Sequence, residues 1–293
     1  MKIAGVVVFY NPTEKMISNI ASYINDLEKL YIVDNSNFDN SELIPKSKKI
    51  VYLPNNKNLG IAAALNIGAK KAIKEKYDWL LTMDQDSKFE NNAVKIILDY
   101  IKTKISNDGD FTKKTGIVTA FHDVGVASNI METEEDNPLM VMTSGNFINL
   151  KAYKKINGFK SELFIDTVDF DFCLNLRIHG YEIVRLKKAR LIHNLGDLVY
   201  GSLFGRKMYS SNHSAVRRYY QVRNRHYIYD WYHEKYPEYC EAEIKRTKRE
   251  LVKIWGCEKH RIKKTIYMIK GYFDYKRGIT GSYEDRKNNT KDL

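Results

Sequence analysis

The sequence predicts an α/β protein with a parallel or mostly parallel sheet, followed by a basic helical region. Short apolar runs alternate with amphipathic stretches between residues 3 and 120, and long helical patterns dominate from about residue 214. The net charge of +12 is the third observation, because residues 201–293 carry 22 Lys and Arg against 11 Asp and Glu. Strand–helix alternation of this kind is typical of a sheet that is covered by helices on both faces.

Composition excludes several classes of protein. The 293 residues are 43% hydrophobic and 29% charged, which is typical of a chain with a packed core and excludes global disorder. The three cysteines have no metal-ligand spacing and indicate a reducing compartment. The first apolar run stops at Tyr10-Asn11-Pro12, too early for a signal peptide, and no run reaches the roughly 18 residues of a membrane-spanning helix. We therefore expect a cytoplasmic protein.

The spacing of apolar residues predicts the elements in order. Buried strands are expected over 3–9, 30–33, 49–53, 79–83 and 116–120. Helices are expected over 14–28, 59–74, 91–104 and 168–179, with a pair of short strands at 182–186 and 190–193. Three long helices follow, over 215–236, 238–255 and 260–276.

Ligands of parallel sheets bind outside the carboxyl ends of the strands, so the residues just after each strand are candidates. Asn11 and Asp34 follow the first two strands, and Asp84-Gln85-Asp86 follows the fourth. Two carboxylates separated by one residue suit Mg²⁺ or Mn²⁺, whose coordination shell is completed by water and substrate phosphates. Such an ion neutralises the charge of a departing diphosphate. The alternative is a solvated turn after a strand.

Two neighbouring features have equally simple structural interpretations. Asp34 could accept hydrogen bonds from a nucleobase or ribose, although residues 34–37 are also a strong turn signal. The segment from Asn58 and Gly60 to Asn66 begins a helix with small residues. Such a helix start favours an anion, or it permits close packing of helix on sheet.

A second acidic cluster consists of Asp166, Asp169 and Asp171. Asp166 and Asp169 are three residues apart and could share one helix face, where one of them would serve as a general base. The alternative is that acids at a helix start act on the helix dipole. His193 follows a strand and is either a third metal ligand or a structural histidine.

Taken in order, these motifs resemble family 2 glycosyltransferases with the GT-A fold, and among them the bacterial rhamnosyltransferases. The resemblance covers residues 3 to about 225. Its pieces are VFYNP at 8–12, VDNS at 33–36, 58–68, DQDS at 84–87, SGN at 144–146, GF at 158–159, FIDTVDFDFCL at 164–174, HNLG at 193–196, and YYQVRN at 219–224. It implies a GT-A domain over 1–212 with a Rossmann-like mixed sheet, and a basic, aromatic-rich helical extension over 213–293.

The resemblance also implies roles. Asp86 is the principal metal ligand, Asp84 lies nearer the ribose and the metal, and His193 approaches the metal or the diphosphate. Asp169 matches the second acid of the family's Glu-Asp pair, the catalytic base. Val168 replaces the first acid, which leaves open whether Asp166 or Asp169 takes the proton; Asp169 is favoured. The donor-binding set is Asn11, Asp34, Asn58, Gly60, Asn66, Asp84 and Arg223.

The implied reaction is an inverting, metal-dependent transfer of a sugar from a nucleotide-sugar donor, by resemblance dTDP-L-rhamnose, to a glycan or polyprenyl-diphosphate-linked acceptor. A UDP-sugar donor and a nucleotidyltransferase are the alternatives within enzymes. The basic aromatic tail suggests three partners: a diphosphate at Arg223, an anionic membrane surface, or nucleic acid. We expect the membrane, because bacterial enzymes of this type work at the inner face of the plasma membrane, and no nucleic acid.

Overall fold

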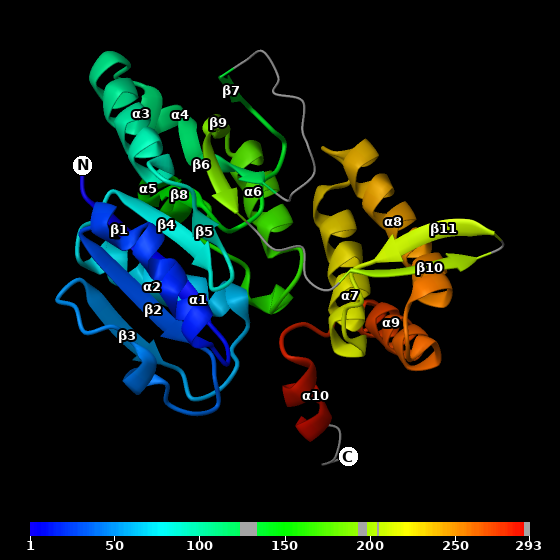
Figure 1. Ribbon diagram of the computed structural model, residues 1–293. Coiled ribbons are helices and arrows are strands. Elements are labelled where there is room, and N and C mark those ends of the chain that lie inside the picture. The colour runs from blue at the N-terminus through cyan, green and yellow to red at the C-terminus, as the bar shows by residue number, and fades with distance from the viewer. Residues whose placement is uncertain (124–133, 193–197, 204, 290–293) are drawn as a thin grey trace. The chain divides into compact units, whose positions relative to one another are not determined.

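The computed structural model describes the chain except residues 124–133, 193–197, 204 and 290–293 (Figure 1). It divides into two compact units. The first contains Met1–Phe159 and Asp169–Asn194, and the second contains Lys160–Val168 and Leu195–Leu293. The expected domain boundary between residues 212 and 213 stays a prediction.

The described strands of the first unit form a nine-stranded mixed sheet. The strand order is β3-β2-β1-β4-β8-β6-β9-β5, and β7 pairs with β9 outside this path. The strands are β1 (Ile3–Phe9), β2 (Lys29–Asp34), β3 (Ile50–Pro54), β4 (Trp79–Asp84), β5 (Lys88–Phe89), β6 (Thr115–Asp123), β7 (Glu135–Asp136), β8 (Asn146–Asn149) and β9 (Glu182–Ile192).

The sheet is parallel where the sequence predicted it. Strands β3, β2, β1 and β4 run parallel to one another, and β8 is antiparallel to both β4 and β6. Strand β6 therefore points in the same direction as β4, and β9 is parallel to β6. All seven residues of β1 are buried, as expected of a central strand with helices on both faces.

The described residues of this part of the chain include the α-helices α1 (Glu14–Ser18), α2 (Ile61–Lys74), α3 (Ala93–Asn107), α4 (Phe111–Lys114), α5 (Leu150–Lys155) and α6 (Val168–Ile178), which begins at the boundary of the units. Helix α2 packs very closely on β1. A Cβ atom at Gly68 would lie 2.3 Å from Cγ2 of Val6, so only glycine fits this crossing without displacement.

The single helix expected over 14–28 is wrong. Helix α1 ends at Ser18, and two short 3₁₀ turns follow, Asn19–Ser22 and Ile24–Asp26. The side chains of Ser18 and Ser22 donate to the carbonyls of Lys15 and Asn19, each 2.7 Å away. Such local side-chain bonds compete with regular helical pairing.

The pair of strands expected at 182–186 and 190–193 is also different: β9 is one continuous strand. In its pairing with β6, Leu186 lies opposite Ala120, and the next pair is Arg190 opposite Phe121. The register therefore shifts between these two pairs. The three residues between them form a bulge, which the charges of Lys187 and Lys188 made look like a turn.

The second unit contains the hairpin β10 (Val199–Leu203) and β11 (Arg206–Ser210), which the sequence did not predict, and the helices α7 (Ala215–Tyr232), α8 (Pro237–Cys257), α9 (Arg261–Lys276) and α10 (Tyr283–Asn289). Helix α9 packs directly on α7. A Cβ at Gly271 would lie 2.4 Å from the carbonyl oxygen of Tyr219. The three long helices were predicted to within a few residues.

Several cations of this unit are internal. Arg218 is 1% exposed and forms ion pairs with Glu250 and Glu258, while Arg225, 4% exposed, binds Glu243 and Glu250. Buried pairs need partners because an unpaired buried charge is costly. Part of the positive charge in the tail therefore serves packing rather than an external partner.

Candidate active site

Three neighbouring strands end at one edge of the first unit's sheet. Strand β1 lies between β2 and β4, with Phe9 opposite Asp34 and Val8 opposite Asp84. Adjacent strands are about 4.8 Å apart, so the backbones of Asp34 and Asp84 are roughly 10 Å apart. The chain extends the sheet from β1 to one side and then returns to add β4 on the other. This arrangement creates the switch point at which open α/β sheets bind ligands.

The segment Asp84-Gln85-Asp86 is held in place by its middle residue and its backbone. Gln85 Oε1 accepts from the Tyr10 amide at 2.9 Å, and its Nε2 donates to the Tyr10 carbonyl at 3.2 Å. Asn19 Nδ2 donates to the Gln85 carbonyl at 2.9 Å, and the Asp84 amide donates to Ser144 Oγ at 3.1 Å. Both carboxylates are half-buried at the strand end.

These two carboxylates fit a divalent cation of the Mg²⁺ or Mn²⁺ type. They are hard oxygen ligands that are close together, and such ions take one or two protein carboxylates and complete their shell with water and phosphate oxygens. Within the described residues, no three His, Cys, Asp or Glu side chains gather to form a closed metal site. His193, the expected third ligand, lies outside the described residues.

The Asp34 carboxylate is fully hydrogen-bonded within the protein. Its side chain is 1% exposed and accepts four hydrogen bonds: from the Ser36 amide (2.8 Å), Ser36 Oγ (2.6 Å), Asn40 Nδ2 (2.7 Å) and Tyr52 Oη (2.8 Å). A carboxylate offers about four acceptor positions, so all are used. The turn interpretation therefore accounts for this residue, and a direct bond to a base would have to replace one of these four.

The predicted donor residues around Asp34 are linked to one another. The Asn11 amide, at a left-handed φ of 48°, donates to Ser36 Oγ at 2.8 Å. Asn35 Nδ2 donates to the Gly60 carbonyl at 3.1 Å, and the Gly60 amide donates to Asn58 Oδ1 at 2.9 Å. Hydrogen bonds thus connect the ends of β1 and β2 to the start of α2, and the predicted donor contacts of these residues stay a prediction.

Asn66 has a structural assignment. Its Oδ1 accepts from Tyr153 Oη at 2.5 Å and from the Phe159 amide at 3.0 Å, and its Nδ2 donates to the Phe159 carbonyl at 2.8 Å. The amide therefore fixes the turn around Gly158 to the middle of α2. Its predicted contact with the donor finds no support in this geometry.

Asp169 lies in helix α6, whereas Asp166 precedes the helix in a left-handed backbone conformation. Helix α6 begins at Val168, whereas Asp166 and Thr167 have left-handed φ values of 62° and 61°. The prediction that Asp166 and Asp169 could share a helix face is therefore wrong. Asp169 lies in the first turn, half-buried, and its Oδ1 accepts from the Phe170 amide at 3.0 Å.

Asp166 is paired with a cation of α7. Arg217 approaches both of its carboxylate oxygens, with Nε and Nη2 at 3.1–3.2 Å. Burial raises the pKa of the Asp166 carboxyl, and the charge of Arg217 opposes that shift. Asp169 belongs to the same compact unit as Asp84 and Asp86, whereas Asp166 belongs to the second unit.

Arg223 does not offer its guanidinium to a ligand. The side chain is 0% exposed, and all five of its N–H groups have acceptors within the second unit, at 2.8–3.5 Å. The acceptors are the carbonyls of Glu162, Leu163 and Gly281 and the side chains of Tyr219 and Asn224. The predicted contact of Arg223 with a diphosphate is therefore not supported, because no donor remains.

Two residues at this edge were not singled out from the sequence. Ser144, 0% exposed, accepts from the Asp84 amide, and its carbonyl accepts from His122 Nε2 at 2.8 Å. Strand β6 extends to Asp123 instead of ending at residue 120, which brings His122 to the same edge as Asp84. The SGN motif at 144–146 was part of the family resemblance, but nothing in the motif indicated that Ser144 would bind the Asp84 amide.

Comparison with known proteins finds similarity in the segment that contains these strand ends. Residues 6–121 match the family model for glycosyl transferase family 2, a segment that contains Asp34, Asp84 and Asp86. A dTDP-rhamnosyl transferase of Shigella flexneri, RfbF, is 28% identical over 245 residues, which cover 76% of this chain and 78% of the relative.

Solved structures show the same fold. GalNAc-T7 with UDP, GalNAc and Mn²⁺ has a TM-score of 0.53 at 15% identity, covering 66% of this chain and 44% of that one. Staphylococcus aureus TarS 1-349 in complex with UDP has a TM-score of 0.50 at 13% identity, covering 67% and 61%. This chain thus matches less than two thirds of either structure. The chain therefore has the GT-A fold, and it is similar to family 2 glycosyltransferases over residues 6–121 and to a bacterial rhamnosyl transferase over most of its length.

Proposed function

We propose that the protein is a metal-dependent, inverting glycosyltransferase that transfers L-rhamnose from dTDP-L-rhamnose to a hydroxyl of a glycan or lipid-linked glycan. The observation that carries the proposal is the alignment of Asp34 and Asp84 at the switch point, with Asp86 two residues beyond. The choice of donor rests on the similarity to the rhamnosyl transferase RfbF.

In this proposal metal binding and proton transfer are assigned to different carboxylates. Asp84 and Asp86 hold a divalent cation, which when bound neutralises the charge of the leaving diphosphate. Asp169 accepts the proton of the acceptor hydroxyl, whose oxygen attacks the anomeric carbon while the nucleoside diphosphate leaves from the opposite face. One displacement of this kind inverts the anomeric configuration. Asp169 is favoured over Asp166 because it shares a compact unit with Asp84 and Asp86.

The buried network around Asp34 shapes the donor site indirectly in this proposal. Ser36 links the Asn11 amide to the Asp34 carboxylate, so these residues fix the loop after β2 against the end of β1. Base recognition would then depend on the shape and backbone groups of this loop. Asp34 acts here as a positioning residue.

The test compares matched substitutions in the full chain with dTDP-L-rhamnose and Mg²⁺ or Mn²⁺. Asp86→Ala should abolish both turnover and the metal-dependent thermal shift that the donor produces. Asp169→Asn should keep that thermal shift and lose about 10²–10⁴-fold in turnover, the range of general-base catalysis. Asp99→Asn, an exposed carboxylate on α3, is the control and should match the wild type.

Two outcomes would change the assignment. If Asp166→Asn is inactive while Asp169→Asn remains active, the base is Asp166. If the protein releases pyrophosphate from a nucleoside triphosphate instead of a nucleoside diphosphate from a nucleotide sugar, it is a nucleotidyltransferase. A screen that includes UDP-sugars separates the donor alternatives, because only the correct donor should be slowly hydrolysed.

We also propose that the acceptor is met at an anionic membrane surface, with the basic second unit as the attachment. Residues 201–293 carry twice as many cations as carboxylates. None of the helices in the described ranges combines the length and the hydropathy that a membrane crossing requires.

A further inference from the structure

Helix α9 exposes a stripe of large apolar side chains. Ile262, Ile266, Ile269 and Phe273 are 68%, 46%, 51% and 53% exposed. Their spacing of four, three and four residues places them on one face of the helix. A contiguous exposed apolar face is uncommon on a monomeric protein and marks an interaction surface.

The opposite face of α9 is the one that the second unit buries. Lys264, Met268, Gly271 and Asp274 are its buried residues. Gly271 lies against the backbone of α7, and the two buried charges are paired, Lys264 with Glu258 and Asp274 with Arg286. The helix thus buries two charges and exposes three isoleucines, which packing within the unit does not explain.

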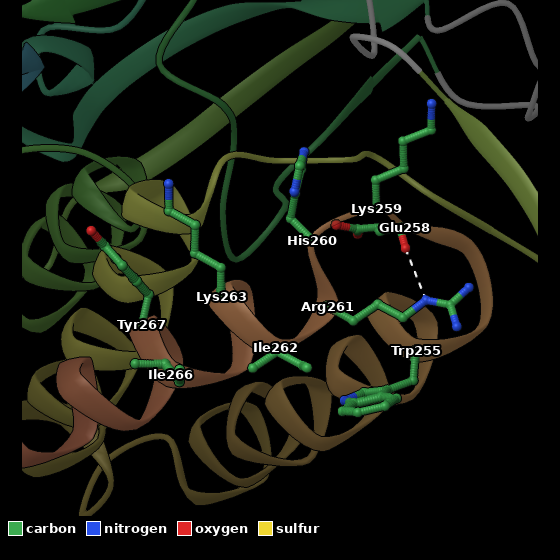
Figure 2. A pocket seen from close by; sticks show the side chains of 9 residues that line it. All are labelled: Trp255, Glu258, Lys259, His260, Arg261, Ile262, Lys263, Ile266 and Tyr267. Atoms are coloured by element: carbon green, nitrogen blue, oxygen red, sulfur yellow. Dashed lines mark hydrogen bonds between the residues drawn. The ribbon is translucent and has the colours of Figure 1, made fainter.

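The stripe continues onto the end of α8. Trp255, 44% exposed, donates from Nε1 to Thr265 Oγ1 at 3.2 Å, which holds its ring beside the first turns of α9. Trp255, Ile262 and Ile266 line one hollow of about 780 Å³. In Figure 2 the amino groups of Lys259 and Lys263 extend toward the upper part of the view, and the three apolar side chains lie below them.

The accessible charge at this hollow is positive. Lys259, Arg261 and Lys263 line it and are exposed. Glu258 is the acidic residue of the lining, but it is 2% exposed and binds Arg218, Lys264 and Ser210. Lys270 follows Lys263 by seven residues, so the two exposed lysines lie in a row beside the stripe. The acid of α9, Asp274, is buried.

We propose that this surface, Trp255 with the stripe Ile262, Ile266, Ile269 and Phe273 and the lysines Lys259, Lys263 and Lys270, docks onto an anionic lipid bilayer. An apolar helix face with cations beside it matches a membrane interface, where the apolar side chains enter the acyl boundary and the lysines meet the headgroup phosphates. A second copy of the chain fits less well, because two such faces would bring like charges together.

This inference deepens the proposed membrane attachment by naming its surface, and it does not depend on sugar transfer. Vesicle binding and glycosyl transfer are measured separately. An inactive protein that still binds vesicles would sink only the proposed activity, and an active protein that does not bind them would sink only this surface.

The experiment is flotation of the full chain with two kinds of vesicle, phosphatidylcholine alone and phosphatidylcholine mixed equally with phosphatidylglycerol. The wild type should bind the anionic vesicles and release them at high salt. The double variant Lys259→Glu, Lys263→Glu should lose at least tenfold in the partition constant, since each surface lysine contributes roughly a fivefold factor. Ile262→Glu, at a 68% exposed position, should lose a comparable factor without a change in the melting temperature.

Matched controls are Lys102→Glu on α3 and Leu43→Glu, an exposed lysine and an exposed leucine of the first unit. Both should bind as the wild type does. Equal binding of the wild type to neutral and anionic vesicles, or full binding by folded Ile262→Glu, would overturn the proposal. A concentration-dependent dimer that Ile262→Glu disrupts, without vesicle binding by the wild type, would assign the surface to a second copy instead.

Discussion

Replacing Arg223 by lysine separates the structural role of this residue from the diphosphate contact that the sequence suggested. The arginine donates to three backbone carbonyls and two side chains, and it is fully buried. Lysine keeps the charge but has three donors at one point, so at least two of these bonds are lost. At about 1–1.5 kcal/mol for each bond, with the cost of unpaired buried acceptors, Arg223→Lys should destabilise the chain by about 2–4 kcal/mol.

The assay is urea unfolding of the full chain followed by far-ultraviolet circular dichroism and tryptophan fluorescence. Trp231 and Trp255 belong to the second unit, so the fluorescence transition should shift to lower urea. Arg217→Lys is the control on the same helix, because its side chain is 44% exposed and its ion pair with Asp166 should be worth less than about 1 kcal/mol. An unchanged Arg223→Lys transition, combined with lost binding of dTDP, would refute the structural assignment.

Three further predictions test the edge of the sheet and the second unit. Gly68→Ala should destabilise the protein by about 1–3 kcal/mol in urea unfolding through overpacking, because a Cβ at Gly68 would lie 2.3 Å from Val6. The double variant with Val6→Ala should therefore be destabilised by less than the sum of the two single variants. Tyr52→Phe removes one of four hydrogen bonds to Asp34, so it should cost about 1–2 kcal/mol and weaken dTDP binding in calorimetry; unchanged affinity would deny the positioning role. Burial, reinforced by two nearby arginines, lowers the pKa of His213 to about 4. Between pH 6.5 and 4 the unfolded chain binds this proton and the folded chain does not, so the free energy of unfolding should fall as pH falls, and His213→Gln should flatten that slope in denaturation measured across this range.

The parallel half of the sheet was predictable because its physical causes are local. Strand β1 is apolar throughout and β4 is mostly apolar, and polar residues mark their ends, Asn11 shortly after β1 and Asp84 as the last residue of β4. Ligand sites follow from strand ends, so the edge with Asp34 and Asp84 could be anticipated without knowing the strand order. Motifs at that edge also belonged to the family resemblance, and the comparisons find the same similarity over residues 6–121.

The side-chain contacts that the sequence did not predict involve partners far away in the sequence. Asn66 is claimed by Phe159, and Arg223 by carbonyls at Glu162 and Gly281. The sequence alone does not distinguish a buried structural arginine from a phosphate-binding one, because both can have aromatic residues beside them in the sequence. The left-handed backbone at Asp166 likewise depends on how that segment packs, and no local rule demands it.

Helix α9 buries charged residues and exposes apolar ones, so its sites that are sensitive to substitution are not those that hydropathy suggests. A hydropathy reading would rank Lys264 as a surface residue and Ile262 as core, yet Lys264 is 4% exposed and Ile262 is 68% exposed. Folding therefore constrains the charged residue, whereas any constraint on the isoleucine has to come from outside the fold. Variation at position 262 that follows the composition of the host's lipids, rather than the rest of the core, would be the evolutionary trace of that difference.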